Sequence, residues 1–303
     1  MAAKRRQDRS EAVTSEPTHL ERLLNLAEQT ETAMADLVKL VGFQSTKAVV
    51  DGGRRSLIVS GGPYWRPLNM DGLRAQAKAI ELYEKFDDLV GFALQASVPA
   101  LIERFRDNRS VLSGLVNQLD PTYSEIGQRM LDFAPALREQ VAILTQAAFR
   151  EAENLVVPDT NVVLAVPELQ QLAAGQLRVT VVLVPTVLRE LDSLKVSSRP
   201  SSVRSKAIAA VRRLKEMRRR GDILKGVTLE GTVRLRALPL EPKTSELVSW
   251  LDPSNMDDRL LASAMSVARR NLAGRTSLVT SDVNLQNKAA FAELPCFEPP
   301  ATP

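Results

Sequence analysis

The 303-residue sequence predicts an α/β domain, built on a parallel sheet with helices on both faces, that follows an all-α N-terminal domain. From Asn154 onward, short runs of β-forming residues alternate with helical patterns, and this alternation is typical of a parallel sheet covered by helices. Before Asn154, apolar residues recur mainly at helical spacing. The length exceeds that of one typical domain, and a hydrophobic content of 44% can supply two cores.

These patterns divide the chain into four segments. We expect a basic, disordered tail over 1–17, a helical domain of unknown role over 18–150, the α/β domain over 151–298 and a short tail over 299–303. The first tail is polar and includes three consecutive cations, a composition typical of disorder.

The N-terminal half shows three helical stretches. The first begins after Thr18, a residue suited to cap a helix, and ends near Gly42. The second covers 71–116 with a break near Pro99, and the third covers 121–151. Positive and negative charges balance over this half, and no cluster of acids or glycines indicates chemistry there. A helical extension of this kind usually packs against a partner protein or a second copy of the chain.

Residues 44–69, between the first two helices, are punctuated by glycine and proline around one short β-like run. This pattern predicts a loop or a small hairpin. Trp65 and Arg66 place an aromatic ring beside a cation there. The ring can stack on nucleic-acid bases, or it can equally well fill a helical core.

Strands and helices alternate in the C-terminal half. The predicted order is a strand from Asn154 to Val157, a helix over 168–174, a strand over 178–184, a helix from Thr186, a helix over 203–220, a β-rich stretch over 226–238, a helix over 256–271, a strand over 276–280, a helix from Val283 and a short strand near Cys296. Pro185 is expected to be the first residue of its helix, since proline fits the first helical turn.

Four acids stand where a strand or loop gives way to a helix: Asp159, Glu190, Asp257 and Asp282. Their separations of 31, 67 and 25 residues suit successive βα units of one sheet. Ligands of open α/β sheets bind at the carboxyl ends of the strands, so acids at those ends are candidates for a site.

Composition excludes several classes of chemistry. Cys296 is the only cysteine and His19 the only histidine, so disulfide frameworks, Cys/His zinc sites and histidine-dependent nucleophiles are not expected. No phosphate-binding GxxxxGK[ST] loop occurs, which argues against a nucleotide cofactor. Apolar runs are too short for membrane helices, and the polar N-terminus is no signal peptide. We therefore expect a cytoplasmic protein without membrane contact.

Four motifs in order, DTNVVL, VLRELDSLK, DDRLLASA and LVTSDVNLQNKA, make residues 154–298 resemble the PIN-domain nucleases. The resemblance implies a metal-dependent ribonuclease that cleaves single-stranded RNA. It places the family's four acidic positions on Asp159, Glu190, Asp257 and Asp282. Asp258 adjoins the third position, and we prefer Asp257 because LLASA then aligns best with the apolar, alanine-containing helix of the family. The N-terminal half resembles no family.

Carboxylates without histidine suit Mg²⁺ or Mn²⁺, which prefer oxygen ligands. Asp159, Glu190, Asp257, Asp258 and Asp282 are the predicted metal ligands, and all of them except Asp258 are the predicted catalytic residues. The alternative is that the aspartates only cap helices. Capping does not explain Glu190, which lies inside its helix. Short polar residues beside Asp159 and Asp282 can position a metal-bound water, or they can simply form the hydrogen bonds of the turns. These residues are Thr160, Asn161, Thr280 and Ser281.

Positive charge is concentrated over residues 195–220, where ten cations face one acid, Glu216. Because a site made of carboxylates repels phosphate, a neighbouring cationic helix can hold a nucleic-acid backbone. The alternative is a solvated helix face. The predicted nucleic-acid contacts are Arg204, Lys206, Arg212, Arg213, Arg218, Arg219 and Arg220.

The sequence is thus interpreted as a metal-dependent endoribonuclease that acts on single-stranded RNA. One rival is a PIN fold that no longer turns over and serves as an RNA-binding or assembly module, and another is the ribonuclease of a toxin–antitoxin pair. A phosphatase of the haloacid-dehalogenase kind needs a second aspartate two residues after the first, where this chain has Asn161. A protein partner or second copy would bind through residues 18–150.

Overall fold

The computed structural model describes residues 17–40, 43–44, 64–65, 69–117, 125–148, 152–174, 176, 178–196 and 201–300. These residues form two compact units. One contains Leu23–Gly91 and Ser97–Ala147. The other contains Ala148–Pro303 together with Phe92–Ala96 and the chain up to Arg22. The domain boundary near residue 150 stays a prediction, and the tails predicted at the two ends lie almost entirely outside the described residues.

The N-terminal unit is helical, as predicted. Its helices are α2 (His19–Leu40), α3 (Met70–Leu94), α4 (Pro99–Asn117) and α5 (Glu125–Ala147). Thr18 and Glu21 form a reciprocal cap at the start of α2, since the Thr18 hydroxyl accepts from the Glu21 N–H at 3.2 Å and the Glu21 carboxylate accepts from the Thr18 N–H at 2.6 Å. Fully buried side chains such as Phe86 and Phe133 fill the core.

The segment between α2 and α3 is described only at its ends. Strands β1 (Phe43–Gln44) and β2 (Tyr64–Trp65) pair antiparallel, which agrees with a hairpin. Arg66 and the segment between the two strands lie outside the described residues. In the part of the chain that the structure describes, no helix is both long enough and apolar enough to span a bilayer.

The C-terminal unit is built on a six-stranded sheet in the order β5-β6-β4-β3-β7-β8. The strands are β3 (Asn154–Pro158), β4 (Val179–Leu183), β5 (Val227–Glu230), β6 (Val233–Ala237), β7 (Arg275–Val279) and β8 (Cys296–Phe297). All neighbours pair parallel except β5 with β6. The predicted parallel sheet is therefore confirmed, with one antiparallel pair at the β5 side, where Gly231, with φ of 53°, starts a two-residue turn that reverses the chain.

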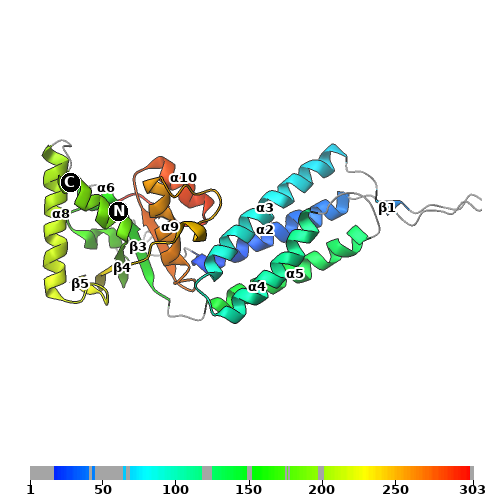
Figure 1. Cartoon of the computed structure of the whole chain (residues 1–303), viewed down its shortest axis with the longest axis horizontal. Helices are drawn as coiled ribbons and strands as arrows, with labels where there is room; N and C mark the ends of the chain where they lie inside the picture. Colours follow the sequence, from blue (N-terminus) through cyan, green and yellow to red (C-terminus); the bar gives the residue numbers. More distant parts are fainter. Residues whose placement is uncertain are drawn as a thin grey trace, which may run out of the picture. The chain divides into compact units, whose positions relative to one another are not determined.

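Helices connect the strands of this sheet (Figure 1). They are α6 (Thr160–Ala165), the 3₁₀ turn η1 (Leu169–Ala173), α7 (Pro185–Val196), α8 (Ser201–Arg220), the 3₁₀ turn η2 (Thr244–Glu246), α9 (Met256–Ala268) and α10 (Val283–Phe291). In Figure 1, α6 and α8 lie on one side of β3 and β4, and α9 and α10 on the other. Right-handed crossovers in both directions along the sheet produce this arrangement.

Burial explains why these strands and helices form. Every residue of β4 is buried, as are all but the first of β3 and β7, which fits strands covered on both faces. Nearly the whole of α9 is buried, from Leu260 to Ala268. Two elements differ from the predictions: the helix expected over 168–174 is a 3₁₀ turn, and α6 is a six-residue helix too short to show helical periodicity in the sequence.

The parallel strands place their carboxyl ends along one edge of the sheet. Asp159 follows β3, α7 follows β4, Glu241 lies four residues after β6, and Asp282 lies three residues after β7. This edge, called the carboxyl edge below, therefore gathers side chains that are far apart in the sequence.

Candidate active site

Asp159 is buried at the carboxyl edge, with 5% of its surface exposed. It is the N-cap of α6, and its Oδ1 accepts a hydrogen bond of 2.6 Å from the Val162 N–H. Its Oδ2 accepts a hydrogen bond from the Thr280 hydroxyl, which follows the neighbouring strand β7. Two donors from different elements thus fix the orientation of this carboxylate.

Glu190 lies in the second turn of α7 and points toward α6. Its Oε2 accepts a hydrogen bond of 2.8 Å from the hydroxyl of Thr160, the residue next to Asp159. Thr160 is itself buried, with 3% exposure. The contact brings an acid from inside a helix to the end of β3, so Glu190 is no isolated solvated side chain.

Asp282 is the N-cap of α10, where its Oδ1 accepts a hydrogen bond of 2.9 Å from the Leu285 N–H. Its own N–H donates to the Thr280 hydroxyl oxygen at 3.0 Å. Thr280 therefore bonds to both Asp159 and Asp282, and it joins the ends of two adjacent strands.

The two acids at the start of α9 have different surroundings. Asn255 caps this helix, so neither acid is needed for capping. Asp258 is buried, and its two oxygens accept hydrogen bonds from the Lys288 ammonium and, at 2.9 Å, from the Asp252 N–H. Asp257 is exposed at the surface of the domain. Of the two, Asp257 is the acid whose carboxylate is not held by a lysine.

Electrostatic effects connect four of these acids. Burial raises the pKa of Asp159, and the charges of Glu190 and Asp282 raise it further, against the hydrogen bonds from Thr280 and Val162. Partial desolvation raises the pKa of Asp257, the charge of Asp282 adds to this, and Lys288 opposes it. Pairwise charge effects therefore link the four acids in a chain, Glu190 with Asp159, Asp159 with Asp282, and Asp282 with Asp257.

A divalent cation fits the chemistry of this cluster. All the candidate ligands are carboxylate oxygens, the donors that Mg²⁺ and Mn²⁺ prefer, and their mutual repulsion is what a bound cation relieves. Among the described residues, no three Asp, Glu, His or Cys side chains already converge tightly enough to enclose an ion. Hydrogen bonds from threonine hydroxyls and helix N–H groups hold the carboxylates of three of the acids, Asp159, Glu190 and Asp282.

The predicted polar neighbours divide into two kinds. Thr160 and Thr280 are buried and bind the acids directly. Asn161 and Ser281 are exposed. Sequence reasoning assigned all four to positioning water or satisfying turns, and it missed the contacts between threonine hydroxyls and carboxylates, because residues 30 and 121 positions apart show no periodic relationship.

Sequence reasoning also missed three cations that form ion pairs near the predicted acids. Lys288 on α10 pairs with Asp258. Arg189 on α7 and Arg259 on α9 both pair with Glu241. Arg189 adjoins Glu190, and Arg259 adjoins Asp258. Lys288 lies on α10, the helix that Asp282 caps. Glu241 also follows a strand of the sheet, which is the signal that could have identified it, but two prolines in its loop obscured the pattern.

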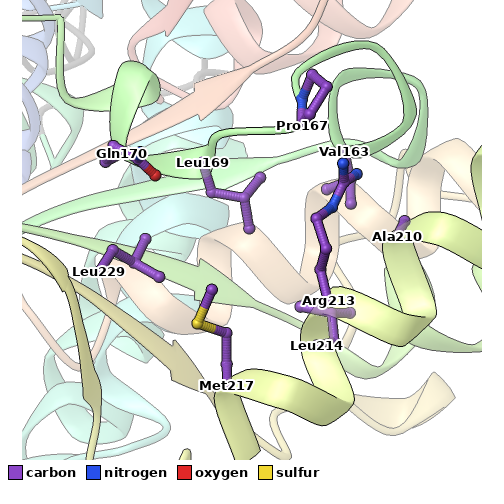
Figure 2. A pocket seen from close by; sticks show the side chains of 9 residues that line it. All are labelled: Val163, Pro167, Leu169, Gln170, Ala210, Arg213, Leu214, Met217 and Leu229. Carbon is purple, nitrogen blue, oxygen red and sulfur yellow. The ribbon is translucent and has the colours of Figure 1, made fainter. Parts of the chain in front are cut away.

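The basic helix α8 packs through a narrow apolar stripe. Ala207 and Ala210 are buried, and Leu214 and Met217 continue the stripe at helical spacing. Figure 2 shows Met217 on α8 facing Leu229 on β5, around a cavity of about 30 Å³ that also touches η1. The stem of Arg213 runs beside this cavity, and desolvation lowers the pKa of its guanidinium.

The other predicted nucleic-acid contacts on α8 are exposed. In the described part of the chain, Arg204, Lys206, Arg218 and Arg219 have no acidic partner, and Arg212 pairs only with Glu216 at 3.4 Å. Arg220 donates to the Thr228 carbonyl. The C-terminus of α8 lies toward the carboxyl edge, because Ile223, three residues beyond it, accepts from the N–H of Ala237 at the end of β6.

Comparison with known families agrees with this geometry. Residues 156–299 match the model of the PIN domain. No curated protein matches the chain. The match begins at the third residue of β3, covers the rest of the six-stranded sheet and all five acids, and confirms the resemblance seen in the motifs. Residues 156–299 therefore match a PIN domain, whose fold is of the nuclease type.

Proposed function

We propose that this protein is a metal-dependent endoribonuclease that hydrolyses phosphodiester bonds of single-stranded RNA. The observation that carries the proposal is the placement of four acids, Asp159, Glu190, Asp257 and Asp282, at the carboxyl edge. Hydrogen bonds through Thr160 and Thr280 tie Glu190 and Asp282 to the end of β3, and a pairwise charge effect links Asp282 with Asp257. Acids held near one another in a structural role would need cationic partners. Among the described residues, none of these four acids forms an ion pair, whereas the adjoining Asp258 pairs with Lys288.

The roles of the residues follow from their contacts. Asp159, Glu190, Asp257 and Asp282 would hold Mg²⁺ or Mn²⁺, the kind of ion that PIN domains usually use. When bound, such an ion lowers the pKa of a coordinated water and stabilises the charge that develops on a phosphodiester. Thr280 and Thr160 hold the carboxylates of Asp159 and Glu190 in place, which reduces the reorganisation that binding requires.

The substrate would reach this site along a cationic path. Acids repel phosphate until a cation neutralises them, so binding of RNA needs positive charge nearby. The exposed cations of α8 supply it, and the helix ends toward the carboxyl edge. Single strands are preferred in this proposal because the resemblance of the four sequence motifs to PIN-domain nucleases implies them. The helical unit is proposed to bind a partner protein or a second copy.

The decisive experiment is a cleavage assay with a labelled single-stranded RNA in magnesium, manganese or chelator. We expect endonucleolytic products with either metal and none with chelator. Asp282→Asn is expected to abolish cleavage, because it removes a ligand charge while an asparagine still caps α10. Asp192→Asn is the matched control, since Asp192 is exposed on α7 and, among the described residues, pairs only with Lys195. Cleavage that persists in chelator, or in the Asp282 variant, would refute the proposal.

A further inference from the structure

Arg189, Glu241 and Arg259 form a charged cluster at the carboxyl edge, called the Arg–Glu–Arg cluster below. Arg189 binds the Glu241 carboxylate through both terminal nitrogens, one of them at 2.8 Å. Arg259 donates to the same carboxylate. One carboxylate therefore holds two guanidiniums, and the cluster has a net charge of +1.

The cluster is adjacent to the proposed active site on two sides. Arg189 precedes Glu190 on α7, and Arg259 follows Asp258 on α9. The two helices contact each other one turn away, where the buried hydroxyls of Thr186 and Ser263 lie 3.5 Å apart. Because successive helical residues point about 100° apart, Glu190 turns toward Thr160 while Arg189 turns toward the loop that follows β6.

Stability alone does not account for this arrangement. The side chains of Arg189, Arg259 and Glu241 are 48%, 35% and 25% exposed, and ion pairs so close to solvent contribute little to folding. A second guanidinium on the same carboxylate also adds repulsion between like charges. In the described structure, Arg259 donates only through one terminal nitrogen, so the rest of its planar fork faces no protein acceptor.

We propose that the Arg–Glu–Arg cluster binds a backbone phosphate of the nucleic acid beside the scissile bond, with Glu241 as the residue that positions both guanidiniums. The proposal rests on the proposed ribonuclease function and assigns a separate contact to its substrate. A guanidinium fork matches the geometry of a phosphate, and holding two forks in advance lowers the entropy lost on binding. The acids beside the cluster repel a phosphate, and the net positive charge of the cluster offsets that repulsion locally.

Binding of a labelled single-stranded RNA to the full chain, measured at several salt concentrations in calcium, tests the proposal. Arg189→Gln and Arg259→Gln are each expected to weaken binding about fivefold and to reduce the slope of log affinity against log salt by about 0.7. Arg270→Gln is the matched control, since Arg270 is exposed just beyond the other end of α9, roughly 16 Å from Arg259. It is expected to change affinity less than twofold.

Glu241→Gln separates positioning from simple charge. Loss of a carboxylate near RNA should strengthen binding if only net charge matters, whereas loss of the positioned forks should weaken it. We expect weaker binding, and stronger binding would overturn the role given to Glu241.

The outcomes distinguish this proposal from the proposed function. If the unmodified chain binds no RNA, the ribonuclease proposal and the cluster proposal both fail. If it binds RNA and both arginine variants match Arg270→Gln in affinity and slope, only the cluster proposal fails. Should Arg259→Gln not fold, as judged by circular dichroism, the more exposed Arg189→Gln decides the matter alone.

Discussion

The Thr280 hydroxyl donates a hydrogen bond to the Asp159 carboxylate, although 121 residues separate the two positions. The same hydroxyl oxygen accepts from the Asp282 N–H at 3.0 Å. Thr280, an uncharged residue, thus orients the carboxylate of Asp159 and holds the backbone of Asp282, two of the proposed ligands. Mutation of such supporting residues in metal sites usually weakens metal binding or activity about 10- to 100-fold.

Thr280→Val is expected to lower manganese affinity and cleavage by at least about tenfold, since valine keeps the volume and removes the hydroxyl. Thr276→Val is the control, because Thr276 is buried on β7, four residues before Thr280, and accepts a hydrogen bond from Asn271, away from the acids. Both variants should lose about 1 kcal/mol of stability. Isothermal titration with Mn²⁺ and urea unfolding measure the two effects, and equal metal affinities would show that Thr280 plays no special part.

Asp159→Asn is expected to raise the melting temperature of the metal-free protein at pH 7. Because the pKa of Asp159 is raised in the folded state, the folded chain holds this proton more tightly than the unfolded chain does. Its contribution to stability is therefore present below the unfolded pKa and is lost as pH rises through the folded pKa. The advantage of the variant should shrink under acidic conditions and grow toward neutral pH.

Magnesium should reverse this order. The unmodified chain gains stability from a ligand that binds only its folded form, while the Asp159 variant gains little. Melting curves with and without the ion, recorded by circular dichroism, compare the two proteins. A variant that is stabilised by magnesium as much as the unmodified chain would remove Asp159 from the site.

Lys288→Met is expected to destabilise the domain by about 3 kcal/mol, because it leaves the buried Asp258 carboxylate without its cation. Lys195→Met is the control: its partner Asp192 is 65% exposed, and the loss should be under about 0.5 kcal/mol. Adding Asp258→Asn to the Lys288 variant should restore much of the stability. Urea unfolding measures all three, and a loss in the Lys288 variant no larger than in the control would contradict the ion-pair account.

The places of Asp159, Glu190 and Asp282 at strand ends and in helices were predictable from the sequence because they depend only on local patterns. Asp159 and Asp282 end apolar runs, and Glu190 follows Pro185 within one helix, so strand ends and helix starts could be located from nearby residues. The strands β3, β4 and β7 could be predicted for the same reason, since β-forming residues fill each run.

The partners of those acids were not predictable in this way. Lys288 reaches Asp258 across 30 residues, and Glu241 binds arginines 52 residues before it and 18 after it. Such contacts depend on how the helices pack at the carboxyl edge, and the spacing of apolar residues in the sequence gives no information about that packing. The reversal of β5 was missed for a related reason, because its β-rich stretch allowed either direction until the turn at Gly231 was located.

His19 is expected to make folding sensitive to acid. Burial lowers its pKa from 6.5 to about 4, and the Arg22 charge adds to this, against a hydrogen bond to the Glu293 backbone. The folded state therefore binds fewer protons than the unfolded state, so stability is fully present above pH 6.5 and is lost as pH falls toward 4. The loss at pH 4.5 should be roughly 2–3 kcal/mol.

His19→Leu isolates this effect from the carboxylates that titrate in the same range. The difference in unfolding free energy between the variant and the unmodified chain should change by that amount between pH 7 and pH 4.5, in favour of the variant at the lower pH. Urea unfolding at both pH values measures it. A constant difference would mean that His19 is not buried in its neutral form within the C-terminal unit.

The exposed cations of α8 give the last prediction. If Arg204, Lys206, Arg218 and Arg219 bind phosphates, replacing all four with Gln should weaken RNA binding for every sequence alike. The slope of log affinity against log salt should fall by about 0.7 for each phosphate that the variant no longer binds.

A control with the same change in charge replaces Lys39, Arg74, Lys78 and Arg138, exposed residues that pair with acids of the helical unit. Stabilisation of the fold by the metal should stay the same in both variants, since neither set includes or pairs with the four proposed metal ligands. Fluorescence anisotropy in calcium at several salt concentrations measures affinity and slope. If both variants have the slope of the unmodified chain, the positive charge of α8 serves solvation, and the RNA follows another path to the acids.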